Sequence, residues 1–357
     1  MHISKKILFA PLDWGLGHAS RCIPLIKECI INRNEVIIAG NQTISDLLKT
    51  EFPQLQYLYL PGYDVSYSAK KWALPFLILI QLPKIRKAIL AENRWLDRII
   101  EEFQIDLVIS DNRYGLHSTK IPCIFITHQL QIQVPQSSIV QEWVNRINHL
   151  LIKKFSVCLV PDYEVDKMSG HLSEATGLTN ITYIGNLSRF SLTVKSEPLY
   201  DLLVLLSGPE PQRSLLEQIL LEQIQDSEIK TLIVRGKPGS LDTLTFSNNI
   251  TVANHLSASD LQTAIVSSAM VICRSGYSTV MDLIKLNKRA ILIPTPGQTE
   301  QEYLAYYLTE MKWFMTCEQK DISIANLLEQ YSSFSFTQFP HWKLEHYKEI
   351  LNSLLTL

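Results

Sequence analysis

A strand followed directly by a glycine turn and a helix is the feature that most constrains how this chain can fold. The apolar run 269–272 has the length of a buried strand, and the apolar-periodic run that begins at Val280 is typical of a helix. Gly276 lies between them, so the chain turns within a few residues. The first backbone N–H groups of a helix have no partner inside it and carry the positive end of its dipole. The sequence therefore predicts a place suited to a phosphate or diphosphate.

The residues of this turn suit the same role. Ser275 adds a hydroxyl donor, Gly276 lets a ligand approach the backbone, and Tyr277 stands where the helix is expected to begin. Asp282, one turn further on, could accept hydrogen bonds from the hydroxyl pair of a sugar. A simpler explanation stays open, because Ser or Thr followed three residues later by an acid also forms a capping box, which needs no ligand.

Short β-branched runs alternate with helical patterns along the whole chain. In the first half we expect strands at 6–11, 35–39, 57–60, 106–110, 122–127, 157–161 and 181–184, and helices at 18–31, 43–50, 72–103 with a break near Pro83, and 136–155. In the second half we expect strands at 201–206, 231–235, 250–252, 269–273 and 290–294, and helices that end near 224 or span 257–268, 277–286 and 299–311. This alternation predicts an α/β protein with two Rossmann-like domains of parallel strands.

The polar segment 188–199, which contains Pro198, is the predicted linker. It separates a first domain at 1–187 from a second at 200–338, and we expect the two to face each other across a cleft. The amphipathic segment 339–357 is predicted to be a helix that packs back across the domain pair. Ligands of such sheets lie beyond the carboxyl ends of the strands, so the loops there are the places to search for chemistry.

Composition excludes several classes of protein. The net charge of −2 gives no electrostatic reason to expect a nucleic-acid partner. The 6 cysteines are scattered without a Cys-x-x-Cys pair, so we expect reduced, buried thiols in a cytoplasmic protein and no metal site. The first apolar run is too short for a secretory signal, and the longest, 72–80, is too short to span a membrane.

A glycine loop follows the first expected strand. Gly15 and Gly17 allow a tight turn into a helix and leave His18 in its first turn. The helix dipole favours the neutral imidazole there, which suits a general base. Arg21 lies three residues on, on the same face, and could hold an anionic group on the acceptor side. A plain glycine turn with a surface histidine is the alternative.

Ser207 and Gly208 follow the first strand of the second half, where a phosphate loop would lie. Pro209 and Pro211 remove backbone donors from this loop, so a rigid turn is an equally good interpretation.

Two further loops carry polar residues with open roles. Gln301 and Glu302 stand near a helix start and could bond sugar hydroxyls, although acids at a helix N-terminus are favoured without any ligand. Asp111 and Arg113 end a strand of the first half and could line the cleft on the acceptor side, or belong to an ordinary polar loop.

The stretch 72–82 is apolar and is followed by the basic residues Lys84, Arg86 and Lys87. Such a segment could lie on a membrane surface or contact a lipid tail. A buried helix hairpin is the more common explanation of a short apolar run.

Together these motifs resemble a known family. A Gly-x-Gly-His loop after the first strand, an Arg-Ser-Gly turn and a later Gln-Glu segment are similar to the GT-B glycosyltransferases. The resemblance is to glycosyltransferase family 28, which includes the bacterial enzyme that adds N-acetylglucosamine to the lipid-linked peptidoglycan precursor. It is specific over 254–307, and in the first half it is confined to the glycine loop and the rhythm of strands and helices.

The resemblance implies a role for each matching residue. It implies that Ser275 and Gly276 bind the donor diphosphate, that Asp282 holds the donor ribose, and that His18 faces the acceptor. The remaining positions it implies are Gln301 and Glu302 for the donor sugar, and Asn254, His255 and Leu256 for the loop near the uracil. Glu302 stands where the family has Gln, and Ser207-Gly208-Pro209 has fewer glycines than the family's loop.

The expected activity is therefore that of an inverting, metal-independent hexosyltransferase that uses a UDP-sugar as substrate and needs no cofactor. The sugar, N-acetylglucosamine in the relatives, would pass to a hydroxyl of a lipid-linked or cell-envelope glycan. The expected location is the cytoplasm, at the inner face of the plasma membrane. Two alternatives stay open: a nucleotide-sugar hydrolase of the same fold in which His18 activates water, and a non-catalytic binding subunit.

Overall fold

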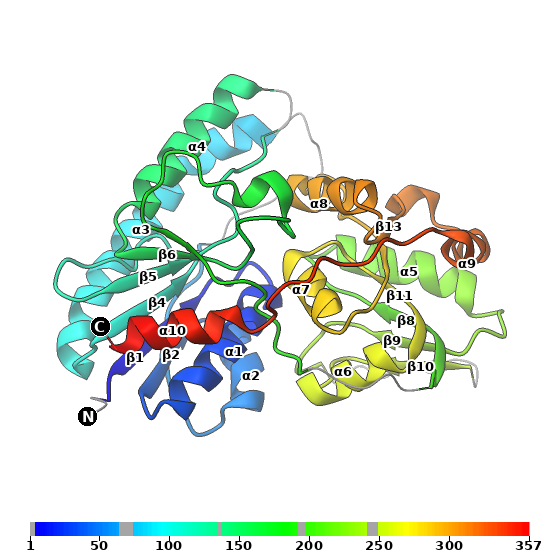
Figure 1. Cartoon of the computed structure of the whole chain (residues 1–357), viewed down its shortest axis with the longest axis horizontal. Coiled ribbons are helices and arrows are strands. Elements are labelled where there is room, and N and C mark those ends of the chain that lie inside the picture. Colours follow the sequence, from blue (N-terminus) through cyan, green and yellow to red (C-terminus); the bar gives the residue numbers. More distant parts are fainter. Residues whose placement is uncertain (1–3, 64–73, 135–136, 192–196, 241–248, 357) are drawn as a thin grey trace. The chain divides into compact units, whose positions relative to one another are not determined.

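The structure, a computed structural model, describes residues 4–63, 74–134, 137–191, 197–240 and 249–356. It divides into two compact units, the first formed by Met1–Arg189 with Trp342–Leu357 and the second by Phe190–His341. Each unit is a parallel β-sheet with helices packed against it, as Figure 1 shows. The predicted linker 188–199 includes residues 192–196, which lie outside the described residues.

The described part of the first unit contains a 7-stranded parallel sheet with the order β3-β2-β1-β4-β5-β6-β7. Its strands are β1 (Lys6–Pro11), β2 (Glu35–Gly40), β3 (Gln56–Tyr59), β4 (Leu107–Asp111), β5 (Cys123–Ile126), β6 (Val157–Val160) and β7 (Ile181–Tyr183). Its α-helices are α1 (Leu16–Ile31), α2 (Gln42–Glu51), α3 (Leu74–Phe103), α4 (Ser138–Ile152) and α10 (His346–Thr356). The central strands are apolar almost throughout because helices cover both faces of the sheet.

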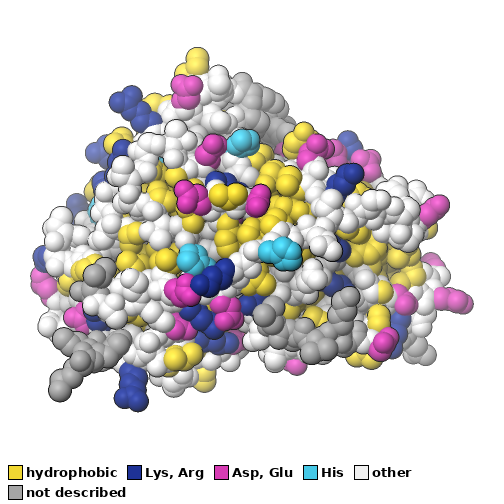
Figure 2. Space-filling model, in the orientation of Figure 1, with side chains coloured by type: hydrophobic (Ala, Val, Ile, Leu, Met, Phe, Trp, Pro, Cys, Tyr) yellow, Lys and Arg dark blue, Asp and Glu magenta, His cyan; other side chains and the backbone are white. Residues whose placement is uncertain are grey.

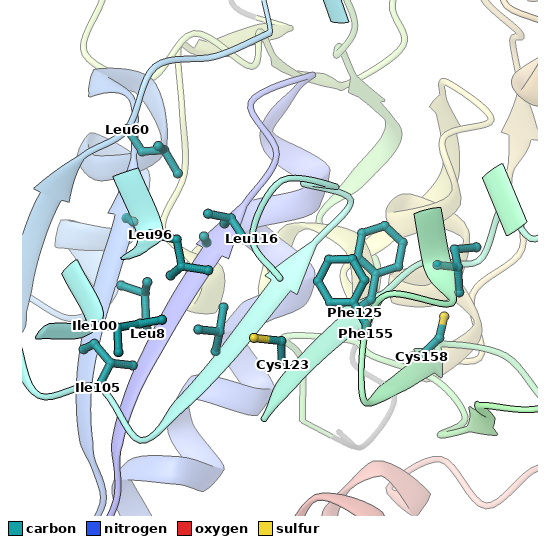
Figure 3. Close-up of a cluster of buried hydrophobic side chains, with 14 of the residues drawn as sticks. Leu8, Leu60, Leu96, Ile100, Ile105, Leu116, Cys123, Phe125, Phe155 and Cys158 are labelled. Carbon is teal, nitrogen blue, oxygen red and sulfur yellow. The ribbon is translucent and has the colours of Figure 1, made fainter. Parts of the chain in front are cut away.

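A buried cluster fixes α3 against one face of this sheet. Figure 3 shows Leu8 of β1 and Phe125 of β5 packed with Leu96 and Ile100 of α3 in a continuous apolar layer. The alternate residues of β1, such as Phe9, point to the opposite face and are equally buried. The sheet is therefore packed on both faces.

The described part of the second unit contains a 6-stranded parallel sheet with the order β10-β9-β8-β11-β12-β13. Its strands are β8 (Tyr200–Leu205), β9 (Thr231–Val234), β10 (Ile250–Ala253), β11 (Ser268–Cys273), β12 (Ile291–Leu292) and β13 (Met315–Thr316). Its α-helices are α5 (Gln212–Ile224), α6 (Ala258–Val266), α7 (Tyr277–Lys285), α8 (Thr299–Glu310) and α9 (Ile324–Ser333). A buried cluster that includes Leu202 and Val204 of β8, Leu216 of α5 and Ile272 of β11 joins α5 to the sheet.

The prediction of two Rossmann-like domains is confirmed, and three details were wrong. Helix α3 continues through Pro83 without a break, because a proline removes one backbone N–H donor and the bonds on either side of it can still hold the helix. Strand β13 and helix α9 were not predicted; the two residues of β13 are too few to carry a readable periodicity. The C-terminal helix begins at His346, after Pro340 and Trp342, whose indole Nε1 donates to the carbonyl of Asp166.

Helix α10 belongs to the first unit, where Asn352 donates to Glu28 Oε1 at 3.1 Å and accepts from Asn32 at 2.9 Å.

All six cysteines are free thiols, five of them buried. Acidic and basic side chains are interspersed over the face in Figure 2, in keeping with the small net charge. Among the described residues no helix is long and apolar enough to cross a membrane. Trp72 and Ala73 of the predicted lipid-contacting stretch lie outside the described residues, and for 74–82 only the helical backbone is described.

Candidate functional site

Both sheets have a topological switch point, and the predicted site residues gather at each. In the first sheet β1 lies between β2 and β4. The chain leaves β1 toward β2 on one side and leaves β4 toward β5 on the other, so the loops after β1 and β4 diverge. In the second sheet β8 and β11 stand in the same relation. Open α/β sheets bind their ligands at such points, beyond the carboxyl ends of the strands.

In the first unit the glycine loop places His18 beside the end of β4. Gly15 precedes α1 with a φ of 108°, a left-handed conformation that favours glycine, and Gly17 lies in the first turn of the helix. His18 Nδ1 lies 2.8 Å from Oδ1 of Asp111, the last residue of β4. The His18 side chain is 16% exposed, whereas Asp111 is fully buried. A histidine whose Nδ1 is held by a carboxylate presents its Nε2 for proton transfer.

Arg21 contacts the same carboxylate from one turn further along α1. Its Nε donates to Asp111 Oδ2 at 2.5 Å, and its Nη2 donates to Asp111 Oδ1. Its Nη2 also lies 3.0 Å from His18 Nδ1, and its Nη1 lies 3.2 Å from Nδ1 of His128. His18 Nδ1 cannot donate to Asp111 and accept from Arg21 at once. We assign the proton to Nδ1, because a carboxylate can only accept.

This arrangement sets the charge of Asp111. Burial favours the neutral acid, but the neighbouring charges of Arg21 and His18 and their hydrogen bonds outweigh it and hold the pKa of Asp111 well below its usual range. The pair Arg21–Asp111 is nearly buried on both sides and carries no net charge. The anion that Arg21 holds in the structure is thus an internal carboxylate.

Arg113 lies only two residues beyond Asp111 but serves a different network. Its side chain is fully buried, and its Nε donates to Glu92 Oε1 at 2.7 Å. The other carboxylate oxygen of Glu92 accepts from the Tyr63 hydroxyl at 2.5 Å and from Gly115 N at 3.1 Å. Arg113 therefore holds the loop after β4 in place and presents no surface to an acceptor.

In the second unit the turn after β11 leads directly into α7. Gly276 is the N-cap of the helix, and no side chain caps it, so the capping box considered as the alternative does not form. A Cβ placed on Gly276 would meet no atom within 4 Å, so open space faces this residue. Tyr277 is buried as the first residue of α7. An uncapped helix start beside open space is the arrangement that an anion needs.

Ser275 and Gln301 tie this turn to the start of α8. Ser275 is fully buried and donates its hydroxyl proton to the Gln301 carbonyl at 2.8 Å. The side-chain Oε1 of Gln301 accepts from Thr295 N at 2.9 Å. Glu302 Oε1 accepts from Gly297 N at 3.0 Å. The Ser275 hydroxyl is thus used inside the protein, and the structure brings three of the predicted donor residues next to one another.

The remaining predicted residues border the same edge of the sheet. Ser207 and Gly208 are exposed after β8, and Gly208 has a φ of 100°. Asp282 is 7% exposed on α7. After β10, Asn254 accepts from Arg235 Nη1 at 3.0 Å and donates to the Ser240 carbonyl at 3.0 Å. His255 and Leu256, which follow, are half-buried.

Three residues of these edges were missed by the sequence. His128 contacts Arg21 from the segment after β5, and Thr295 follows β12 with a buried hydroxyl that has no hydrogen-bond partner among the described residues. Arg274 directly precedes the turn and is fully buried. Its place in the Arg-Ser-Gly motif was visible in the sequence, but its burial was not. No three His, Cys, Asp or Glu side chains within the described ranges gather closely enough to hold a metal ion.

Comparisons with known proteins agree with this architecture. Residues 202–337 match the family model described as the glycosyltransferase family 28 C-terminal domain. An "uncharacterized glycosyltransferase" of Methanosarcina mazei is 24% identical over 333 residues, which cover 85% of this chain and 83% of that protein.

Two further proteins, one a sequence relative and one a solved structure, are also similar to this chain. The UDP-N-acetylglucosamine--N-acetylmuramyl-(pentapeptide) pyrophosphoryl-undecaprenol N-acetylglucosamine transferase of Haemophilus ducreyi is 28% identical over 145 residues, 39% of this chain and 40% of that protein. The crystal structure of Acinetobacter baumannii MurG superimposes with a TM-score of 0.58 at 13% identity, and covers 99% of this chain and 100% of that one. The chain is a glycosyltransferase of the GT-B type, and residues 202–337 form its glycosyltransferase family 28 C-terminal domain.

Proposed function

We propose that this glycosyltransferase is an inverting, metal-independent enzyme that moves a hexose-type sugar, such as N-acetylglucosamine, from a UDP-sugar to a hydroxyl of its acceptor. The observation that carries the proposal is the uncapped start of α7 at Gly276, which faces open space at the switch point of the second sheet. The name of the Haemophilus ducreyi relative supports the choice of donor.

The donor diphosphate is proposed to bind against the backbone at the start of α7. The N–H groups there and the helix dipole favour two phosphates. Since Ser275 gives its hydroxyl proton to the Gln301 carbonyl, the backbone rather than this hydroxyl would donate to the phosphates. Ser207 and Gly208 would close the other side of the diphosphate. Charge that develops on the leaving group is stabilised by these fixed donors, so the proposal requires no metal.

The rest of the donor is proposed to follow the carboxyl edge of the second sheet. Asp282 accepts hydrogen bonds from the ribose hydroxyls. Gln301 uses its Oε1 on Thr295, so its amide NH2 is the end that would donate to the sugar, beside the carboxylate of Glu302. Asn254 uses both ends of its side-chain amide within the protein, so the uracil would meet the backbone of Asn254, His255 and Leu256.

His18 is the proposed general base. The acceptor hydroxyl loses its proton to His18 Nε2 as its oxygen attacks the anomeric carbon and the bond to the diphosphate breaks. Asp111 orients the ring through Nδ1 and stabilises the imidazolium that forms. Arg21 holds Asp111 on the acceptor side, and Gly15 and Gly17 give the acceptor access to the loop.

The acceptor is proposed to be a lipid-linked or cell-envelope glycan, reached from the cytoplasmic face of the plasma membrane. Helix α4 supports a peripheral membrane contact, because Ile139, Trp143 and Leu150 share one face of it and are 79%, 43% and 58% exposed. Sedimentation with vesicles of anionic lipid tests this part, and Trp143→Ser should weaken it.

Calorimetric titration with UDP and UDP-N-acetylglucosamine tests the donor site. The decisive variant is Gly276→Ala. With a φ of −71° and no atom near its Cβ, alanine fits the unliganded protein, so stability should be unchanged. Affinity for UDP should fall about tenfold or more if a diphosphate occupies that space, because the ligand must move away from the backbone donors. Ser333→Ala, on the exposed end of α9, is the control.

Product analysis separates the alternatives. Transfer to an acceptor supports the proposal, whereas release of free sugar without acceptor indicates the hydrolase. Tight binding of UDP-sugar without turnover indicates a binding subunit, and unchanged UDP affinity in Gly276→Ala contradicts the proposed donor site.

A further inference from the structure

Arg274 is a buried cation with only neutral partners. It is 0% exposed, and its Nη2 donates to the Gln212 carbonyl at 2.8 Å. Its Nη1 lies 3.3 Å from the carbonyls of both Ile293 and Pro294. Its Nε is buried and has no hydrogen-bond partner among the described residues.

The other buried arginines of the described chain are all paired with a carboxylate. Arg21 pairs with Asp111, Arg113 with Glu92, and Arg213 and Arg235 share Glu217. No carboxylate in the described ranges forms an ion pair with Arg274, and burial alone lowers the pKa of Arg274 to about 10. A buried charge without a counter-ion is costly, so a protein keeps one where something outside the fold compensates it.

The position of Arg274 points to what compensates it. Its three carbonyl partners belong to the start of α5 and the segment after β12, so the guanidinium ties both to the turn before α7. Two more unfilled features lie at this edge. The buried Thr295 Oγ1 has no partner among the described residues and would lie 3.6 Å from a Cβ on Gly208, and open space faces Gly276. A buried charge and a buried hydroxyl here both lack the partner that an anion would provide.

We propose that Arg274 is the built-in counter-charge for the diphosphate of a nucleoside diphosphate donor. Because its guanidinium is enclosed by carbonyls, it acts as a positioning residue, through its field and the loops it ties, without touching the ligand. The diphosphate gains negative charge when the bond to the sugar breaks, so the same field stabilises the leaving group. This inference rests on the proposed function and adds to it the source of the positive charge.

Two substitutions separate charge from packing. Arg274→Gln removes the charge and retains an amide that can donate to the carbonyls, whereas Arg274→Lys retains the charge. The matched control is Arg289→Gln, because Arg289 also donates to backbone carbonyls, those of Trp313 and Thr337, and lies over the Phe339 ring. Calorimetric titration of each protein with UDP and with uridine isolates the contribution of the phosphates.

Arg274→Gln should weaken UDP binding about tenfold to a hundredfold, the order expected for one charge acting over roughly 10 Å at an effective dielectric constant near 20. Uridine binding should change less than about twofold, since uridine carries no charge. Arg274→Lys should keep most of the preference for UDP over uridine, and Arg289→Gln should behave as the wild type.

The inference is overturned if Arg274→Gln binds UDP as tightly as the wild type, or if Gln and Lys weaken UDP and uridine to the same extent. If Arg274→Gln does not fold, Arg274→Lys is the test. Loss of the preference for UDP over uridine in Arg274→Lys contradicts a role for the charge. Whether UDP is the correct donor nucleotide is tested separately, by titrating the wild-type protein with several nucleoside diphosphates. Wild-type binding of dTDP or GDP in place of UDP would correct the base and keep Arg274 in its role, and binding of no nucleoside diphosphate would overturn both.

Discussion

Removing the Asp111 carboxylate should destabilise the protein far more than the loss of an ordinary ion pair. Asp111 is fully buried and Arg21 is 2% exposed, and two guanidinium nitrogens contact the two carboxylate oxygens. Asp111→Asn leaves the Arg21 cation buried without an anion. Breaking a buried pair in this way costs about 3–5 kcal/mol. That is a large share of the roughly 5–15 kcal/mol by which folded domains are stable.

A double-mutant cycle tests whether the charge or the packing is responsible. The single variants Asp111→Asn and Arg21→Met each leave one buried charge, whereas the double variant leaves none. The double variant should therefore be more stable than the sum of the single losses predicts, by about 2–3 kcal/mol. The exposed pair Lys120–Glu101, with an N–O distance of 2.7 Å and exposures of 52% and 71%, is the control and should show almost no coupling.

Urea denaturation followed by tryptophan fluorescence and circular dichroism measures the wild type and the six variants of the two cycles. A coupling between Arg21 and Asp111 as small as that of the control would refute the reasoning, because it would mean that water or another group neutralises Arg21 in the folded state. If the coupling is large but the Asp111→Asn single variant reacts at the wild-type rate, the Arg21–Asp111 pair stabilises the fold. Asp111 then does not orient His18 for the reaction.

Three further outcomes are expected. The folded-state pKa of Asp111 is depressed, so its contribution to stability is complete above an unfolded-state value near 4 and is lost as the pH falls toward the folded value; the urea midpoint of the wild type should fall below about pH 4 more steeply than that of Asp111→Asn. His18→Ala should lower the transfer rate about 100-fold or more with UDP affinity unchanged, and a rate near that of the wild type would exclude it as the base. Asp282→Ala should weaken UDP binding and leave binding of inorganic pyrophosphate unchanged, as judged by calorimetry; equal loss for both would argue against a ribose contact.

The sequence predicted the local units well because each is specified by neighbouring residues. The strand that ends at Cys273, the turn at Gly276 and the helix from Tyr277 are encoded within one short stretch, and β11 and α7 begin and end within a residue of the prediction. The same holds for β1, predicted and found at Lys6–Pro11.

Contacts between distant elements were beyond the reach of that reasoning. His18 and Asp111 are 93 residues apart and meet because β4 pairs with β1, which depends on the order of strands in the sheet. Asp111 and Arg113 both looked like acceptor-side residues, yet one faces His18 and the other is enclosed by Glu92. The direction of a side chain at the end of a strand is decided by which buried partner it finds, and spacing along the chain does not contain that information.

The balance of charge differs between the two switch points, although the two sheets share the same order of their first strands. At the first, the carboxylate of Asp111 is matched by Arg21, so the edge around His18 is close to neutral. At the second, the charge of Arg274 has no internal match among the described residues, and the start of α7 adds the positive end of a dipole. A neutral edge with a histidine suits a hydroxyl that must lose a proton, and a positive edge suits an anion that must leave with more charge. The proposed roles, acceptor at the first switch point and donor at the second, are therefore consistent with which buried arginine has a carboxylate of its own.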